Sequence, residues 1–163
     1  MQDGQAQTAT AVAPDQYLVV VDEQLLAAHL NSSFVVCFYD AVHEAGGMVH
    51  LRNAPAGKAR DAALTDTTLS SDLMLIDHCL AELRVLAPKA KYLQARILAQ
   101  VDASDHARAR FEGMREVLEA FLSDADVKLV SCDLLSVDGQ QMRFDPMMGK
   151  AWVVTQIASS PTG

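Results

Sequence analysis

The chain has 163 residues, of which half are hydrophobic, and it carries a formal net charge of -8. This size and composition predict one domain with a sizeable core. The acidic balance, without any cluster of Lys and Arg, argues against nucleic acids and anionic membranes as partners. Apolar stretches reach only about six residues, far fewer than the roughly 20 that cross a bilayer.

The two ends of the chain differ in composition from its centre. Residues 1–14 are rich in Ala and Gln and lack the basic start and apolar centre of a secretory signal peptide, so they are predicted to form a disordered lead. Residues 159–163 are small and polar, and a disordered tail is predicted there. We therefore expect a single domain over residues 15–158 and, by default, a cytoplasmic location.

The first third of the domain is predicted to consist mainly of strands. Residues 17–21 have strand character, whereas residues 23–33 are ambiguous because their Leu and Ala content favours a helix. Residues 34–39 are apolar and rich in β-branched and aromatic side chains, which is typical of a buried strand. A Gly46-Gly47 turn then leads into a short apolar strand over residues 48–51.

A long helix is predicted next, after an aperiodic stretch over residues 53–66 that is expected to be a mobile loop. Its apolar residues recur at alternating steps of four and three, which places one stripe along about five turns. Pro88 ends the helix. The stripe consists of Leu69, Leu73, Ile76, Leu80, Leu83 and Ala87.

The last part of the domain adds a strand, a second helix and three more strands. The helix is amphipathic over residues 105–122, and Ser104 or Asp105 is expected to cap its N-terminus. Asp138-Gly139 is predicted to form a turn. This order of elements indicates an α+β domain with helices packed on sheets. The strands are expected at residues 92–99, 127–134, 142–144 and 151–157.

Ser33 and His50 occupy positions that suit a nucleophile and its base. Ser33 directly precedes the strand over residues 34–39, and His50 lies on the next strand along the chain. Neighbouring strands can bring both side chains to one edge of a sheet. A hydroxyl attacks a carbonyl carbon when an adjacent imidazole takes its proton. The spacing therefore permits a nucleophile–base pair.

The same segment resembles the CheD family of bacterial chemoreceptor glutamine deamidases. The family's Leu-Gly-Ser-Cys falls on Leu30-Asn31-Ser32-Ser33, and its Gly-Gly-Met-x-His falls on Gly46-Gly47-Met48-Val49-His50. Its closing Phe-Asp-Pro-x-x-Gly is kept over residues 144–149. The resemblance implies a β-sandwich of mixed and antiparallel sheets flanked by helices, similar to the catalytic domain of cytotoxic necrotizing factor toxins. It also favours a strand leading to Ser33 within residues 23–33, and we therefore expect a strand there rather than a helix.

The chain departs from the family where the chemistry is expected. The resemblance implies a catalytic Cys, His and Thr, but the Cys position is Ser33 and the Thr position is Ala27, so only His50 is kept. Serine is less acidic than a thiol, and an alanine side chain cannot orient an imidazole. We therefore predict an inactive glutamine deamidase in which Ser33 and His50 are vestigial. Further family positions are altered at Asn31, Ala99-Gln100, Leu135-Ser136 and Gln140.

Three functions remain open at the level of sequence. The first is a non-catalytic CheD-like adaptor or competitor that binds chemoreceptor cytoplasmic helices or a CheC-type phosphatase. The second is an active amidohydrolase, which requires the Ser33 hydroxyl within hydrogen-bond reach of His50 and a new orienting group in place of Ala27. The third is a ligand-binding or structural domain in another pathway, suggested by the altered glycine turns. No cofactor, nucleic-acid partner or membrane insertion is expected.

Cysteine and histidine spacing predicts no metal site. Cys37, Cys79 and Cys132 are odd in number and widely spaced, and they are expected to be buried, unreactive thiols. Asp40 and His43, with His50, could supply zinc ligands, but their spacing matches no metal motif. The sequence assigns no role to His29, to His43 or to residues 53–66.

Overall fold

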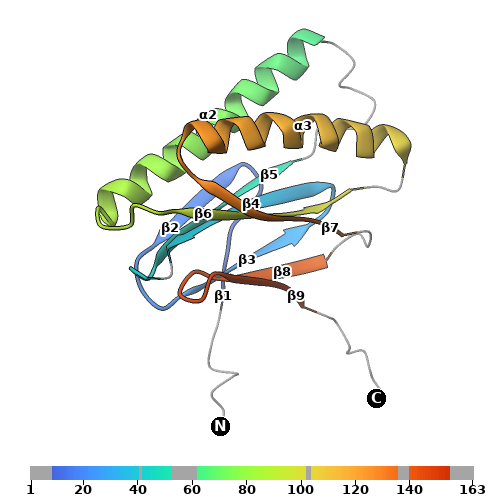
Figure 1. The fold of residues 1–163 in the computed structure, drawn as a ribbon. Coiled ribbons are helices and arrows are strands. Elements are labelled where there is room, and N and C mark those ends of the chain that lie inside the picture. The colour runs from blue at the N-terminus through green and yellow to red at the C-terminus, as the bar shows by residue number, and fades with distance from the viewer. Residues whose placement is uncertain (1–8, 41, 53–61, 102–103, 136–139, 155–163) are drawn as a thin grey trace, which may run out of the picture.

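Two sheets and two helices make up the computed structural model, which describes residues 9–40, 42–52, 62–101, 104–135 and 140–154. Both helices lie on one side of a five-stranded sheet, and a four-stranded sheet covers its other side (Figure 1). The strands are β1 (Ala9–Ala11), β2 (Gln16–Val20), β3 (Leu25–Leu30), β4 (Ser33–Asp40), β5 (Ala45–Arg52), β6 (Gln94–Gln100), β7 (Lys128–Leu135), β8 (Gln140–Asp145) and β9 (Lys150–Val154). The helices are α2 (Ala62–Leu86) and α3 (Asp105–Asp124).

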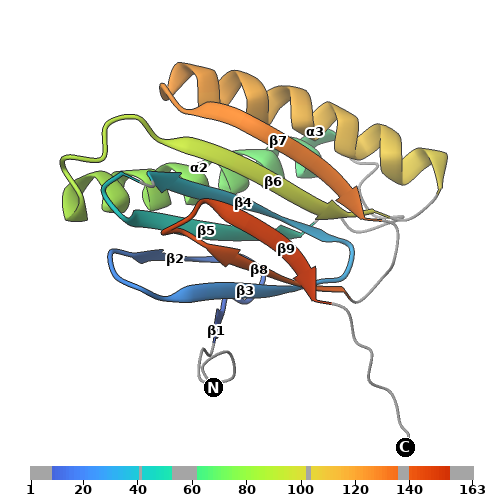
Figure 2. The same ribbon diagram turned by 60° about the horizontal axis from the view of Figure 1, so that its bottom comes forward.

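The strand order explains how the two sheets are connected. The five-stranded sheet has the order β2-β5-β4-β6-β7, and the four-stranded sheet has the order β1-β3-β8-β9. The β1–β3 and β6–β7 pairs are parallel, and the other pairs are antiparallel. The chain passes from the smaller to the larger sheet between β1 and β2 and again between β3 and β4, and the second crossing can be followed in Figure 2. The predicted α+β fold with mixed sheets and flanking helices is thus confirmed.

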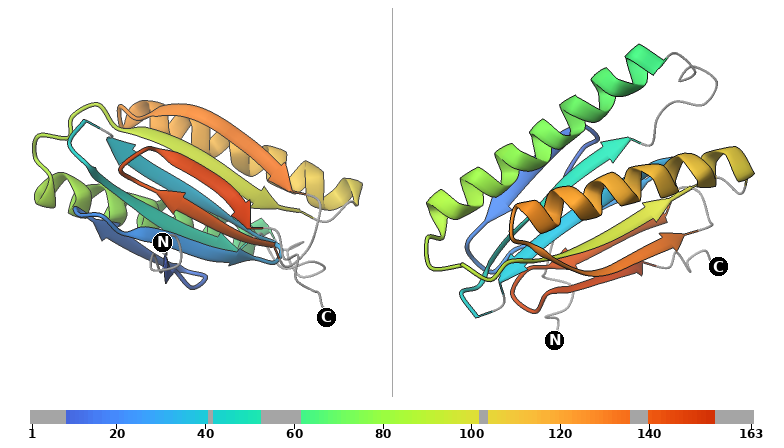
Figure 3. Two further views of the ribbon diagram at one scale, coloured as in Figure 1. Left: turned by 90° about the horizontal axis from the view of Figure 1, so that it is seen from below. Right: turned by 45° about the horizontal axis from the view of Figure 1, so that its top comes forward.

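Two hydrophobic cores separate the three layers. One lies between the helices and the five-stranded sheet, where α2 packs on β2 and β5 and α3 packs on β7 (Figure 3). The other fills the space between the sheets. Strand β4 is buried along its whole length because its residues alternate between these cores. Phe34, Val36 and Phe38 face the helices, and Val35, Cys37 and Tyr39 face the other sheet.

The predicted Gly46-Gly47 turn is wrong, because both glycines lie inside β5. Close neighbours explain why glycine is needed in this strand. A Cβ atom at Gly46 would lie 2.8 Å from Cβ of Pro146, and one at Gly47 would lie 2.9 Å from the carbonyl oxygen of Leu18. The two glycines therefore allow other segments to approach β5, and the connection from β4 is shorter than predicted.

Three more predictions fall partly outside the described residues or need correction. The disordered lead over residues 1–14 is wrong from residue 9 onward, because residues 9–11 form β1 and pair with β3 along one edge. Residues 1–8 lie outside the described residues. The loop over residues 53–66 is wrong from Ala62 onward, where good helix formers begin α2. Residues 53–61, the turn at 138–139 and the tail at 159–163 lie outside the described residues.

The predicted helices are otherwise close to those observed. In α2, three residues of the predicted stripe are fully buried: Ile76, Leu80 and Leu83. Ser104 caps α3 as predicted, because its side chain accepts a hydrogen bond from the N–H of Ala107 at 3.1 Å. The strand that the CheD resemblance favours within residues 23–33 is confirmed, because β3 lies there. Within the described part of the chain, no helix is long and apolar enough to cross a membrane.

Asp72 is an acidic residue on the buried side of α2 that the stripe did not predict. It is 7% exposed, and its Oδ2 atom has no hydrogen-bond partner among the described residues. Burial, reinforced by the nearby charge of Asp15, raises the pKa of Asp72 to about 7. The folded state therefore binds a proton more tightly than the unfolded chain does, and stability falls as the pH rises from about 4 to about 7.

We expect Asp72→Asn to stabilise the protein above pH 7 and to have little effect near pH 3.5. The pKa shift corresponds to at most about 4 kcal/mol, and solvent screening reduces the expected gain to about 1 to 2 kcal/mol. Urea unfolding at both pH values measures the difference in the free energy of unfolding. Asp77→Asn, at an exposed position of the same helix, is the control. An equal gain at both pH values would contradict the assignment.

Candidate active site

The candidate site begins at the turn between β3 and β4, one of the connections between the two sheets. β3 ends at Leu30, β4 begins at Ser33, and Asn31 and Ser32 form the intervening turn. Ser32 has a left-handed backbone with a φ of 52°, a conformation that costs a non-glycine residue roughly 1 kcal/mol. The turn places Ser33 on the face of β4 that looks toward the four-stranded sheet, together with Val35.

Ser33 and His50 are in direct contact. Antiparallel pairing of β4 with β5 sets His50 opposite Val35, so the imidazole lies on the same face as Ser33 and one diagonal step away. The distance from His50 Nε2 to Ser33 Oγ is 2.9 Å. Ser33 is 2% exposed and His50 is 1% exposed. The proximity predicted for the pair is therefore present, in a closed part of the molecule.

A backbone carbonyl orients the imidazole. His50 Nδ1 lies 2.8 Å from the carbonyl oxygen of Val12, which follows β1. Because that oxygen only accepts hydrogen bonds, Nδ1 carries the proton and Nε2 is left to accept from the Ser33 hydroxyl. The Val12 N–H in turn donates to the carbonyl of Ala27 at 2.8 Å. The prediction that His50 lacks an orienting partner is thus wrong, because a main-chain group supplies one.

The surroundings of His50 favour its neutral form. Burial lowers the pKa of His50, and the hydrogen bond to Val12 offsets only part of this effect. A neutral imidazole with a free lone pair on Nε2 is the form that can remove a proton from a hydroxyl. This geometry is compatible with a serine nucleophile and a histidine base.

The two N–H groups ahead of Ser33 are both used inside the chain. The Asn31 N–H donates to Ser33 Oγ at 3.1 Å, and the Ser32 N–H donates to Oε1 of Gln100 at 2.6 Å. Backbone N–H groups beside a nucleophile are the usual donors to the oxyanion formed during acyl transfer. Sequence reasoning flagged Gln100 only as an altered glycine turn and gave no sign of its contact with Ser32.

The other candidate residues make their described contacts elsewhere or lie on the surface, although the charge of His29 is near enough to lower the pKa of His50. His43 Nδ1 contacts Asp40 Oδ2 at 3.1 Å, but Asp40 is at the opposite end of β4 from Ser33, about 23 Å away along an extended strand. His29 is exposed on β3. Among the described residues, no group of three or more His, Cys, Asp or Glu side chains is placed to hold a metal ion.

The cysteines are poorly suited to nucleophilic chemistry. Cys37 and Cys79 are buried as predicted, whereas Cys132 is only half-buried, which corrects the prediction at that position. Burial raises the pKa of all three thiols, of Cys79 to about 12 and of Cys132 to about 11. The thiolate fraction at neutral pH is therefore very small.

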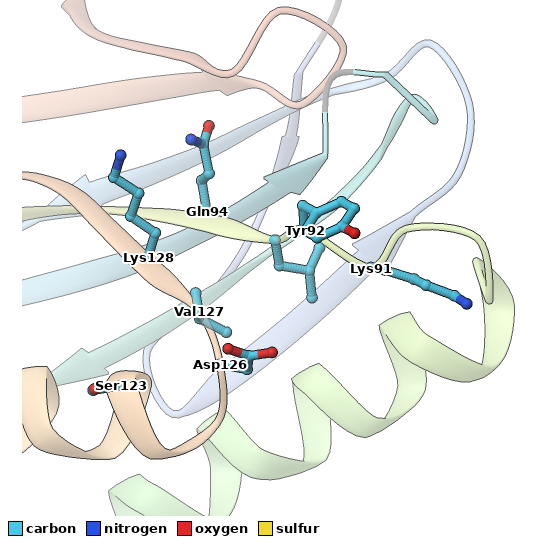
Figure 4. Close-up of a pocket in the computed structure, with 8 residues that line it drawn as sticks. Lys91, Tyr92, Gln94, Ser123, Asp126, Val127 and Lys128 are labelled. Carbon is cyan, nitrogen blue, oxygen red and sulfur yellow. The ribbon is translucent and has the colours of Figure 1, made fainter.

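A surface hollow lies at the far end of β6. Its lining includes Lys91, Tyr92, Gln94 and Lys128, and Tyr92 is 84% exposed. The side chains of Gln94 and Lys128 project in the same direction from neighbouring strands (Figure 4). Gln94 and Gln100 are at opposite ends of β6, about 20 Å apart. The hollow is therefore separate from the Ser33–His50 pair.

The chain is similar in sequence to curated proteins over nearly its whole length. No family model matches it. Three curated proteins from strains of Xanthomonas campestris pv. campestris, each described as a probable chemoreceptor glutamine deamidase CheD, are 26% identical over 154 residues, which cover 93% of this chain and 75% of each relative. Among solved structures, the Bacillus licheniformis hypothetical protein YfiH matches with a TM-score of 0.46 and 14% identity.

The match to YfiH covers 76% of this chain and 51% of the YfiH chain, so this chain spans about half the length of YfiH. The curated relatives cover nearly the whole chain, including Ser33, His50 and the strands that carry them. The chain is therefore similar to CheD proteins over 93% of its length.

Proposed function

We propose that the chain is a CheD-like chemotaxis protein that keeps its Ser33–His50 pair in a closed site and acts by binding rather than by catalysis. The observation that carries this proposal is the internal use of both N–H groups ahead of Ser33, one by Ser33 Oγ and one by Gln100. Each oxyanion donor that is already bonded inside the protein removes a large source of rate enhancement from an acyl-transfer site. The burial of Ser33 and His50 adds to this argument.

The proposed partners follow from the CheD resemblance. They are the cytoplasmic helices of chemoreceptors or a CheC-type phosphatase. An acidic chain is also suited to partner surfaces that present Lys and Arg. On this proposal the protein would compete with an active deamidase for the same partner.

A specific observation also favours a second function, that of an active serine amidohydrolase. The 2.9 Å contact between Ser33 and His50 and the Val12 carbonyl behind the imidazole together meet the two geometric requirements of a hydroxyl nucleophile. Receptor glutamines are the first substrates to test, because the curated relatives are described as chemoreceptor glutamine deamidases.

One experiment separates the two functions. The purified chain is mixed with a receptor cytoplasmic fragment or a CheC-type phosphatase, and complex formation and ammonia release are measured on the same samples. We expect a complex with at least one of them and no ammonia above that of His50→Ala. The matched control is His29→Ala, which removes an exposed histidine from β3.

The two outcomes have distinct meanings. Ammonia release that His50→Ala abolishes and His29→Ala leaves intact would establish the amidohydrolase and refute the non-catalytic proposal. Absence of any complex, together with absence of ammonia, would refute both.

A further inference from the structure

Gln100 is a buried polar side chain placed directly beside the candidate nucleophile. The β4–β6 register pairs Phe34 with Ala99, so Gln100 lies next to Ser33 at the end of the two strands. Leu98, two residues before Gln100, belongs to the core between the sheets, and alternation puts Gln100 on that same face. His50, Ser33 and Gln100 therefore form a row across three neighbouring strands, with Ser33 in the middle.

The carboxamide of Gln100 makes a contact of the kind that an external amide would make there. Gln100 is 1% exposed, and its Oε1 accepts a hydrogen bond from the Ser32 N–H at 2.6 Å. Burying an amide without a partner costs roughly 1 to 3 kcal/mol, so this contact holds the side chain in place. Four polar groups therefore lie close together: the amide oxygen of Gln100, the backbone N–H of Ser32, and the side chains of Ser33 and His50.

We propose that Ser32, Ser33 and His50 form a subsite for a primary carboxamide, and that the side chain of Gln100 occupies this subsite as an internal ligand. The inference deepens the proposed function and rests on it, because it identifies what closes the site. External ligands of the same chemical class, such as glutamine side chains and small primary amides, would bind once Gln100 is withdrawn. Gln100 thereby determines whether the site is open.

A purely structural role for Gln100 makes a different prediction. If the side chain only supports the left-handed turn at Ser32, its removal lowers stability but does not open a place for an amide. The test therefore needs a readout at residue 33 itself, and it needs a variant that fills the same space without an amide oxygen. Gln100→Met meets the second need, since it has nearly the same length and no strong acceptor.

Alkylation of Ser33→Cys by iodoacetamide provides the readout, and it requires no deamidase activity. The reagent is itself a primary carboxamide. The sulfur attacks the iodine-bearing carbon, a carbon–sulfur bond forms, iodide leaves, and the thiol proton passes to His50 Nε2 or to solvent. Labelling at each cysteine is followed by mass spectrometry of peptides. Cys37, Cys79 and Cys132 give a low background because burial raises the pKa of each thiol.

We expect Ser33→Cys with Gln100→Ala to be labelled at residue 33 at least about tenfold faster than Ser33→Cys alone or Ser33→Cys with Gln100→Met, which corresponds to about 1.4 kcal/mol in barrier. Acetamide should slow the labelling of the Gln100→Ala protein by competing for the subsite, and it should not slow that of the Gln100→Met protein. Cys79 reports on folding, since labelling there would reveal a loosened core.

If Gln100→Ala exposes Cys79, Gln100→Asn takes its place in the comparison, because it withdraws the carboxamide by one methylene and leaves most of the volume filled. Equal labelling in all backgrounds, or equal acceleration by Gln100→Met, would overturn the proposal. Failure here would leave the test of ammonia release unaffected, because alkylation depends on access to residue 33 and not on hydrolysis. A protein that releases ammonia in its unmodified form would instead refute the non-catalytic function while leaving the subsite measurable.

Discussion

Gly149→Ala is expected to destabilise the protein by about 2 to 5 kcal/mol, because it combines a left-handed backbone with overpacking. Gly149 lies between β8 and β9 with a φ of 66°. A Cβ atom there would contact Cε2 of Tyr39 and would lie 2.6 Å from Cδ2 of the same ring. The ring has little room to move, because Tyr39 is 5% exposed, packs against Phe144 and carries the guanidinium of Arg96 over one face.

The position also ties three strands together. The Gly149 N–H donates to the carbonyl of Asp145 at 2.8 Å, and its carbonyl accepts from Nε of Arg96 at 2.7 Å. A displaced turn would therefore weaken the contact between β6 and the four-stranded sheet. Urea unfolding followed by circular dichroism measures the loss in the free energy of unfolding.

Gly113→Ala is the matched control for this prediction. Gly113 is exposed within α3, and apart from its chain neighbours and its own helix backbone, no atom of the described residues would lie within 4 Å of a Cβ atom there. Alanine in a helix is favoured over glycine by about 0.5 to 1 kcal/mol, so the control should stabilise the protein. Similar effects of the two substitutions would contradict the account of Gly149.

The local spacing of apolar residues predicted the elements that carry a regular apolar pattern of their own. The strand over residues 34–39 and the stripe through Ile76, Leu80 and Leu83 are examples, and both lie in the core as expected. Features that depend on distant segments were not predictable in this way. Gly46 is needed because Pro146 approaches it, and β1 exists because β3 offers a free edge. Neither partner is visible in the local sequence.

In the candidate site too, local spacing could be predicted from the sequence, whereas contacts between distant segments could not. Ser33 and His50 could be predicted to lie together because they are on neighbouring strands of recognisable spacing. The partner of His50 Nδ1 could not be predicted. It is the backbone carbonyl of Val12, and because every residue has such a carbonyl, the residue type does not indicate the contact. Gln100 is 68 positions from Ser32 in the chain, and only the pairing of β4 with β6 brings them together.

A second large effect is expected when Gln100 is truncated in a variant that carries a cysteine nucleophile, with ammonia release as the measured quantity. Starting from Ser33→Cys, we expect Gln100→Ala to raise ammonia release from receptor glutamine peptides about 100-fold, since one oxyanion donor contributes roughly 100- to 1,000-fold in rate. The gain comes from freeing the Ser32 N–H, which Gln100 holds at 2.6 Å in the unmodified chain. Initial rates at saturating and limiting peptide separate this gain from a change in binding alone.

Ala27→Thr should add little to the same starting variant, although the CheD resemblance places a catalytic Thr there. Leu26 and Ala28 face the core between the sheets, so alternation turns the side chain of Ala27 to the other face of β3. The connection from Ala27 to His50 instead runs through the backbone, from its carbonyl to the Val12 N–H and from the Val12 carbonyl to the imidazole. A new hydroxyl leaves this path unchanged. If Ala27→Thr restored more ammonia release than Gln100→Ala, the orientation of His50 rather than the occupied subsite would be what limits catalysis.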